Sequence, residues 1–235
     1  MQSESFLTCG GVPFFFRSEE EMTLQVGMVS YDDGIVIVGD LWQFVEPKFP
    51  KLRYGYEACK LRMSSCERIA VACARNMDIS SRVAEAIFQR IGPNCTNRWQ
   101  AIIDIGKDIA KGFDVECLVI FADPKPSLYA LLCGAKEGEI RCEEILTAWP
   151  SGDAGNPAYY WIMRYYSGSL SLMQLARLGA MVNVSAEKLN NGVVRNMEVV
   201  TCDKDGIRKW TKEENAALRR EAETLTDKIG AMIIE

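Results

Sequence analysis

Thr23, Asp40 and Lys60 form a set of residues that could hydrolyse an amide bond without histidine. The chain contains no histidine, which excludes Ser-His-Asp and Cys-His catalysis, histidine-zinc sites and proximal-histidine haem sites. A threonine hydroxyl needs a base, and an α-amino group, with a pKa of roughly 7.7–8.0, suits that task near neutral pH. A threonine at a free N-terminus therefore carries its nucleophile and its base in one residue.

A lysine and a carboxylate close to such a threonine would support this chemistry. A nearby ammonium group disfavours protonation of the amine, and a carboxylate holds the lysine in place. Asp40 ends the second of two short predicted strands, and Lys60 opens the strand after the next loop, so both can reach the start of the first strand at Thr23. Each residue type is commonplace alone, so the hypothesis depends on their joint spacing.

The elements that must position these residues begin with two predicted hairpins. Residues 23–29 and 34–40 form strands joined by "SYDDG", whose Asp-Gly pair favours a tight turn. The loop at 41–58 is interrupted by prolines and is predicted to be irregular. Strands are expected at 59–63 and 68–74, separated by a polar turn.

The remaining pattern alternates between helical and strand periods. Helices are predicted at 78–91, starting from Asp78 as N-cap, and at 97–113, then strands at 115–123, 127–134 and 139–149, helices at 155–166 and 171–185, strands at 196–203 and 206–210, and a last helix at 211–229. Thr211 and Glu214 form a Thr-x-x-Glu capping box at the start of that helix. This order suits two packed sheets between helical layers.

Several stretches resemble the proteasome β-subunit family of N-terminal nucleophile hydrolases, of bacterial or archaeal type. They are "MTLQVGMVSYDDGIVIVGD", "CKLRMSSCERIAVACA", "PSGDAGNPAYYWI", "LSLMQLARLGAMVNVS" and "NNGVVRNMEVVTCDKDGIRKW". The resemblance implies an α+β fold, the four-layer αββα sandwich of N-terminal nucleophile hydrolases. It implies Thr23 as nucleophile, Asp40 and Lys60 as its charge pair, and Ser151 as a residue that contacts the amine.

The sequence departs from the family pattern at three places. The loop between Asp40 and Lys60 is longer than in the family, which leaves Lys48 and Lys51 as weaker candidates for the lysine. The oxyanion donor would be the backbone N–H of Ala74, where the family usually has glycine. The Asp-x-x-Ser-Gly motif of the family falls on "KLNNG", which puts Lys188 and Asn191 in place of the aspartate and serine, and Glu187 would substitute only through a shift of one residue.

The resemblance and these departures leave three functional hypotheses. The first is a threonine-type endopeptidase that attacks peptide bonds through an ester intermediate. The second is a non-catalytic β-like subunit that keeps only the fold and the assembly surface, which the "KLNNG" stretch and the leader before Thr23 favour. The third is an amidohydrolase acting on small amides, which shares the nucleophile but not the substrate.

Composition limits the partners. The net charge of −5 and the pI near 5.1 give no basic field for nucleic acid. No apolar run is long enough to span a membrane, and no nucleotide motif or metal-ligand spacing predicts a cofactor. The nine scattered cysteines suit a reduced, cytoplasmic protein. The resemblance implies peptide or unfolded-protein substrates, a homo-oligomeric ring and an unfolding ATPase as a separate partner.

Residues 1–22 are expected to be a leader, a propeptide or a mis-called start, and residues 23–235 a single domain. If translation begins at Met1, the chain must cleave itself between Met22 and Thr23. If it begins at Met22, removal of the initiator methionine exposes Thr23. In both cases the native protein is expected to begin at Thr23.

Overall fold

A computed structural model describes residues 23–45, 54–92, 95–136, 139–152, 155–189 and 195–234. Within these residues the fold is mixed α/β, with two antiparallel five-stranded sheets and five α-helices. The first sheet has the strand order β10-β1-β2-β11-β12. Its strands are β1 (Leu24–Ser30), β2 (Gly34–Gly39), β10 (Ala148–Gly152), β11 (Glu198–Asp203) and β12 (Gly206–Lys209).

The second sheet follows the chain order from β5 to β9. Its strands are β5 (Leu61–Met63), β6 (Ile69–Arg75), β7 (Val115–Phe121), β8 (Ser127–Cys133) and β9 (Ile140–Ile145). A separate two-stranded hairpin joins β3 (Trp42–Val45) to β4 (Tyr54–Glu57). The prediction of an irregular segment across 41–58 was therefore wrong at both of its ends, where the aromatic-rich runs "WQFV" and "YGYE" have the β-propensity that the prolines between them obscured.

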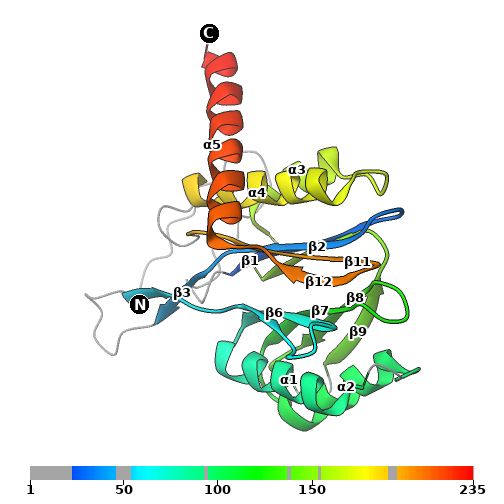
Figure 1. Ribbon diagram of the computed structural model, residues 1–235. Coiled ribbons are helices and arrows are strands. Elements are labelled where there is room, and N and C mark those ends of the chain that lie inside the picture. The colour runs from blue at the N-terminus through cyan, green and yellow to red at the C-terminus, as the bar shows by residue number, and fades with distance from the viewer. Residues whose placement is uncertain are drawn as a thin grey trace, which may run out of the picture.

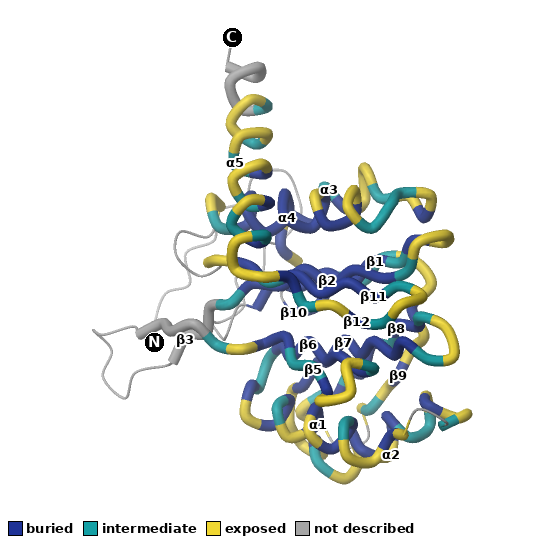
Figure 2. The backbone as a smooth tube through the Cα atoms, in the orientation of Figure 1, coloured by how far each residue is buried: buried dark blue, intermediate teal, exposed yellow. Residues whose placement is uncertain are grey.

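The helices pack against the two sheets from opposite sides (Figure 1). They are α1 (Met77–Arg90), α2 (Arg98–Ile109), α3 (Tyr160–Tyr165), which follows a short 3-10 turn at Pro157–Tyr159, α4 (Leu172–Leu189) and α5 (Lys212–Ile234). One apolar cluster joins α1 and α2 to the second sheet, another joins α3, α4 and α5 to the first sheet, and a third lies between the sheets. Figure 2 shows β1, β2, β6 and β7 as mostly buried, with exposed residues on the outer faces of α1, α2 and α5.

The chain changes sheet between β9 and β10. Residues 139–149 were predicted as one strand, but β9 belongs to the second sheet and β10 to the first. The break falls at Leu146 and Thr147, where the Leu146 side chain is exposed and the Thr147 carbonyl accepts the N–H of Val29 at 2.8 Å. Because of this change, β10 pairs with β1 and brings Ser151 and Gly152 to the N-terminal end of β1.

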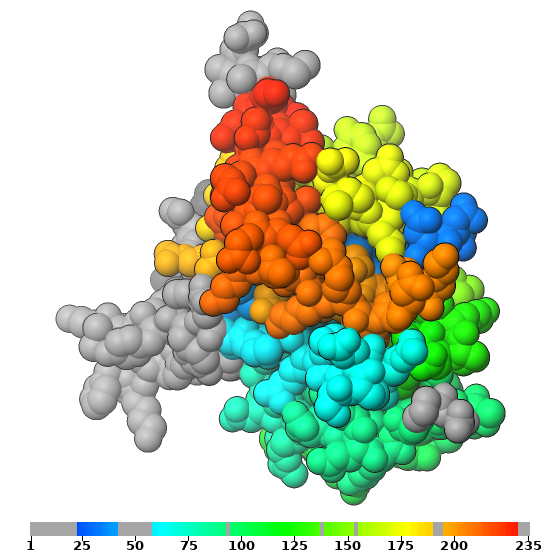
Figure 3. All heavy atoms as spheres, viewed as in Figure 1, coloured from blue at the N-terminus to red at the C-terminus, as the bar shows by residue number. Residues whose placement is uncertain are grey.

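Local sequence explains how α4 and α5 are placed. Gly179 lets α4 approach β2 closely, since a Cβ atom there would lie 2.5 Å from a methyl group of Val38. The predicted capping box is confirmed: the Thr211 N–H donates to the Glu214 carboxylate at 2.8 Å, and the Glu214 N–H donates to the Thr211 hydroxyl at 3.2 Å. The distal part of α5 extends away from the sheets (Figures 1 and 3).

The first turn of α1 differs from the prediction. Asn76, not Asp78, is the N-cap, and its side chain accepts the N–H of Ile79. Within the described ranges, no helix has both the length and the apolar character needed to cross a bilayer.

Candidate functional site

Thr23, Asp40 and Lys60 meet at one end of the space between the sheets. The Lys60 ammonium lies 2.8 Å from Asp40 Oδ2 and donates to Thr23 Oγ1 at 3.3 Å. All three residues are buried, with exposed fractions of 3%, 1% and 1% for Thr23, Asp40 and Lys60. Removal of either member of such a buried pair is costly, because the remaining charge loses the opposite charge that offsets its desolvation.

The β1–β2 hairpin places Asp40 beside Thr23. Its register pairs Gln25 with Gly39, so Asp40 lies one residue beyond the pair, opposite Leu24. The Leu24 N–H donates to Asp40 Oδ1 at 2.8 Å, and the Asp40 N–H donates to the Leu24 carbonyl at 2.9 Å. These two bonds fix the Asp40 carboxylate relative to the start of β1, and therefore relative to Thr23.

The second sheet supplies Lys60, which directly precedes β5. Its carbonyl accepts the N–H of Cys73 on β6 at 2.9 Å, so the backbone of Lys60 is part of the second sheet. Its side chain nevertheless contacts Thr23 and Asp40, which belong to the hairpin of the first sheet. The site therefore forms only when the two sheets pack together.

Ser151 lies on the same face of the first sheet as Thr23. The β1–β10 register pairs Ser151 with Gln25, and side chains two residues apart on a strand share a face. The Ser151 side chain is fully buried, and its Oγ has no hydrogen-bond partner in the part of the chain that the structure describes. Leaving a buried hydroxyl unpaired is unfavourable, so this oxygen is able to accept a nearby donor.

Gly152 packs directly on the backbone of Thr23. It has φ +88°, in the left-handed region that glycine adopts readily, and a Cβ atom at this position would lie 2.0 Å from the Thr23 carbonyl oxygen. The Tyr159 hydroxyl lies 2.9 Å from the carbonyl oxygens of both Gln25 and Ser151, which ties β10 to β1 beside this contact.

The end of β6 is the predicted source of an oxyanion donor. The Gln25 side-chain amide donates to the Cys73 carbonyl at 2.7 Å, so this strand end lies next to the face that carries Thr23. The Cys73 N–H points to Lys60 before β5, and alternation therefore directs the Ala74 N–H toward its register partner Glu116 on β7. The Arg75 N–H is then directed toward the β5 side, where Lys60 lies.

The Cys117 thiol next to this strand end does not offer a second nucleophile. A hydrogen bond with Cys73, together with burial, raises the pKa of the Cys117 thiol well above its usual value. Cys117 therefore stays protonated near neutral pH, and a protonated buried thiol is unreactive. Among the described residues, no group of three or more His, Cys, Asp or Glu side chains is arranged to hold a metal ion.

The other residues considered from sequence lie elsewhere or outside the described ranges. The Glu187 carboxylate forms an ion pair with Arg219 of α5 at 2.7 Å. Lys188 pairs with Asp227, also on α5. Asn191, Lys48 and Lys51 lie outside the residues that the structure describes.

Sequence analysis missed two ionisable residues at this end of the molecule, Arg75 and Glu116. The Glu116 carboxylate is 2.9 Å from the Gly152 nitrogen, and an Arg75 guanidinium nitrogen is 3.0 Å from the Gly152 carbonyl oxygen. A signal was present for Glu116, because it is the one charged residue in the apolar strand "VECLVIF". A charged side chain inside a strand buried on both faces needs a specific partner.

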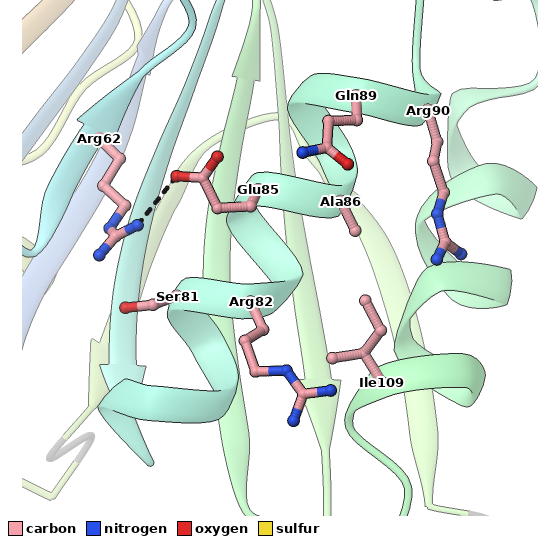
Figure 4. A pocket seen from close by; sticks show the side chains of 8 residues that line it. All are labelled: Arg62, Ser81, Arg82, Glu85, Ala86, Gln89, Arg90 and Ile109. Carbon is pink, nitrogen blue, oxygen red and sulfur yellow. Dashed lines mark hydrogen bonds and ion pairs between the residues drawn. The ribbon is translucent and has the colours of Figure 1, made fainter.

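A groove of about 330 Å³ lies between α1, β5 and the end of α2 (Figure 4). Figure 4 shows Arg62 directed toward Glu85, to which it donates at 3.1 Å, and Arg90 forms an ion pair with Asp108 at 2.6 Å. None of the residues around Thr23 lines this groove. We assign no chemistry to it.

Comparison with known proteins identifies the type of fold. No protein-family profile matches the chain, and no curated protein sequence matches it. Among solved structures, an Anbu (Gly-1) mutant from Hyphomicrobium sp. strain MC1 superposes with a TM-score of 0.65 at 14% identity, over 91% of this chain and 100% of that chain. Anbu (ancestral β-subunit) from Yersinia bercovieri superposes with a TM-score of 0.65 at 12% identity, over 88% of this chain and 96% of that chain.

These comparisons correct the family that the sequence motifs suggested. The matched proteins are proteasome-like but belong to a family distinct from the proteasome β-subunits, so the prediction of membership in the β-subunit family was wrong. At 12–14% identity the likeness shows a proteasome-like fold and nothing about activity.

Proposed function

We propose that this chain is a threonine-type amide hydrolase that acts on peptides, with Thr23 as its N-terminal nucleophile. The observation that carries the proposal is the buried Asp40–Lys60 pair, whose ammonium donates to the hydroxyl of Thr23. A lysine held this close favours the deprotonated forms of both the hydroxyl and a neighbouring amine. The chain lacks histidine, so the amine of Thr23 is the base suited to neutral pH.

The reaction would proceed in two stages. The Thr23 amine accepts the hydroxyl proton, directly or through water, and the oxygen attacks the peptide carbonyl. The proton then passes from the Thr23 amine to the leaving nitrogen, the peptide C–N bond breaks, and an ester remains as the new amine is released. Water then hydrolyses the ester. Asp40 keeps Lys60 charged and in place, and the unpaired Ser151 hydroxyl is suited to contact the Thr23 amine.

The oxyanion that forms in both stages requires a backbone donor. A backbone N–H at the end of β6 would supply it. Sequence analysis favoured Ala74, and strand alternation favours the next N–H, that of Arg75.

This chemistry requires Thr23 to be the first residue of the working protein. In the full chain its nitrogen belongs to the peptide bond with Met22 and cannot act as a base. We therefore propose that residues 1–22 are absent from the active form and that residues 23–235 make up a single domain. The packing of helices on the outer faces of two sheets supports the four-layer αββα sandwich of N-terminal nucleophile hydrolases.

The exposed residues of α3 bear on how the protein assembles, and its free cysteines bear on where it is located. Tyr160, Met163 and Tyr165 of α3 are exposed, which supports a homo-oligomeric ring that buries them. The matched solved structures include one named ancestral β-subunit. An unfolding ATPase would be a separate partner that delivers unfolded protein. The free cysteines at described positions support a reducing, cytoplasmic location.

The test compares three protein preparations on one substrate panel. Protein whose terminus at Thr23 is verified by mass spectrometry, the same protein with Thr23→Ala, and the full chain are each assayed with fluorogenic peptides and with small amides. Peptide turnover by the Thr23-terminal form alone supports the proposal. Turnover of small amides alone would identify an amidohydrolase, and peptide turnover by a form that retains residues 1–22 would refute the mechanism.

A non-catalytic subunit is the second candidate. The ion pairs of Glu187 and Lys188 with α5 favour it, because they engage the side chains that replace the carboxylate of the family motif. No turnover by the verified Thr23-terminal form, with assembly intact by light scattering, would establish this alternative.

A further inference from the structure

Two charged side chains hold the backbone of Gly152 at both of its polar atoms. Glu116 Oε2 accepts the Gly152 N–H at 2.9 Å, and Arg75 Nη2 donates to the Gly152 carbonyl at 3.0 Å. The two side chains also approach each other, with Arg75 Nε 3.6 Å from Glu116 Oε2. The other carboxylate oxygen of Glu116 accepts the indole N–H of Trp149 at 3.3 Å. This group is called the Gly152 clamp below.

The Arg75 side chain reaches Gly152 from an unusual backbone conformation. Cys73, two residues earlier on β6, packs into the helix-covered cluster of the second sheet, and alternation would direct Arg75 to the same face. Arg75 instead has φ +67°, in the left-handed region that a non-glycine residue adopts only when its surroundings enforce it. Its guanidinium lies against β10 of the first sheet. Strain of this kind in a side chain that bridges two sheets points to a functional demand on its position.

We propose that Glu116 and Arg75 are positioning residues for the Thr23 site, and that they act through Gly152. This inference rests on the proposed function. Gly152 packs on the Thr23 carbonyl so closely that a Cβ atom would lie 2.0 Å from the oxygen, so a displacement of Gly152 displaces Thr23. Ser151 precedes Gly152 and moves with it. The clamp therefore sets the position of the nucleophile and of the hydroxyl beside it.

The clamp acts on a different part of Thr23 from the Asp40–Lys60 pair. Lys60 contacts the hydroxyl, whereas the clamp contacts neither the hydroxyl nor the lysine and holds the neighbouring backbone. Because a nucleophile must lie within a fraction of an ångström of its productive position, loss of the clamp lowers the rate of the chemical step. Binding of the substrate is affected much less.

The first variant to test is Glu116→Gln, which keeps the shape of the side chain and removes its charge. Either the Gly152 N–H or the Trp149 indole N–H then faces the NH2 group of the glutamine instead of an oxygen. Arg75 also loses the buried carboxylate with which it forms an ion pair. In the Thr23-terminal protein we expect kcat to fall by about ten- to a hundredfold with KM within about threefold of its original value. Arg75→Lys keeps the positive charge but loses the planar guanidinium, and is expected to act in the same direction.

The matched control is Asp114→Asn. Asp114 is the exposed carboxylate that pairs with Arg75 at 3.5 Å and touches no part of Gly152. We expect kcat of this variant within about twofold of the original, as for most exposed ion pairs. Thermal unfolding is measured for every variant, and Arg75→Lys replaces Glu116→Gln if the latter does not fold.

A second measurement does not depend on turnover. Amide hydrogen exchange in peptides that cover β10 should be faster in Glu116→Gln and unchanged in Asp114→Asn, since the Gly152 N–H then meets either an NH2 group or an uncharged oxygen that accepts more weakly than the carboxylate. Unchanged exchange in Glu116→Gln overturns the clamp whether or not the protein hydrolyses peptides. Unchanged kcat in Glu116→Gln of an active protein overturns its positioning role. If the unsubstituted Thr23-terminal protein shows no turnover, that result counts against the proposed function. The exchange measurement still shows whether the Gly152 clamp exists.

Discussion

Two ion pairs flank Thr23, and they differ in what they touch and in how much water reaches them. Asp40 and Lys60 have side chains only 0–1% exposed, and Lys60 contacts the Thr23 hydroxyl. The pair of Glu116 and Arg75 has exposed fractions of 5% and 31% and holds the backbone of Gly152. We propose that the two pairs meet two requirements of one site: the first pair controls protonation at the nucleophile, and the second controls its position.

The largest effect on hydrolysis is expected from substitution of Thr23, which lies beside both ion pairs. Thr23→Ala removes the nucleophile, so peptide hydrolysis should fall to the background rate, while the fold and the assembly persist because alanine fits the start of β1. The assay is turnover of a fluorogenic peptide beside light scattering. Thr23→Ser, which keeps a hydroxyl, is the matched control and should retain measurable activity. Unchanged turnover in Thr23→Ala would show that neither ion pair serves a nucleophile at this position.

Lys60→Met should reduce both activity and stability. The rate should fall by at least ~10²-fold, because the amine of Thr23 is then more readily protonated. The free energy of unfolding should fall by about 3–5 kcal/mol, because the Asp40 carboxylate stays buried without its partner. Denaturant unfolding and steady-state kinetics measure the two effects.

The double variant Asp40→Asn/Lys60→Met sharpens the contrast between stability and catalysis. It should recover part of the stability, since no unpaired charge remains, and none of the activity. Lys48→Ala and Lys51→Ala serve as controls. A larger loss of rate in either control than in Lys60→Met would mean that Lys48 or Lys51, and not Lys60, assists Thr23.

Gly152→Ala tests the contact through which the clamp is proposed to act. The added methyl group would lie 2.0 Å from the Thr23 carbonyl oxygen at a residue with φ +88°, so β10 must shift or the backbone must change conformation. We expect a loss of about 1–3 kcal/mol in unfolding free energy and a lower kcat with little change in KM. A Gly152→Ala protein with full activity would show that Thr23 does not depend on this contact.

The parts of this picture that sequence could predict are those encoded by neighbouring residues. The β1–β2 hairpin follows from alternating apolar residues around an Asp-Gly turn, and its register alone brings Asp40 to the start of β1. The capping box of α5 is equally local. Lys60 could be proposed because it opens the strand predicted after the loop at 41–58 and because a family resemblance drew attention to it.

The parts that sequence could not predict depend on contacts between distant elements. Residues 139–149 form a continuous strand-like run, and only the packing of two sheets decides that the chain changes sheet at Leu146. Arg75 would face the helices by alternation, and its left-handed backbone reverses that direction. The stretches that suggested proteasome β-subunits led to a proteasome-like fold, which the matched solved structures share, but to the wrong family.

The smallest expected effect is a difference in salt dependence between the two pairs. Salt screens charges that water can reach and has little effect on buried ones, and the Debye length falls from about 10 Å at 0.1 M to about 3 Å at 1 M. The Asp40–Lys60 pair should therefore be insensitive, whereas the half-exposed Arg75 should hold Glu116 and Gly152 less tightly at 1 M salt. We expect kcat to fall by no more than about twofold across this range. In Glu116→Gln, where the clamp is already lost, the same change in salt should leave kcat unaltered. An equal salt effect in the unsubstituted protein and in Glu116→Gln would mean that salt acts on substrate binding or assembly. The salt dependence would then not support the distinction between the two ion pairs.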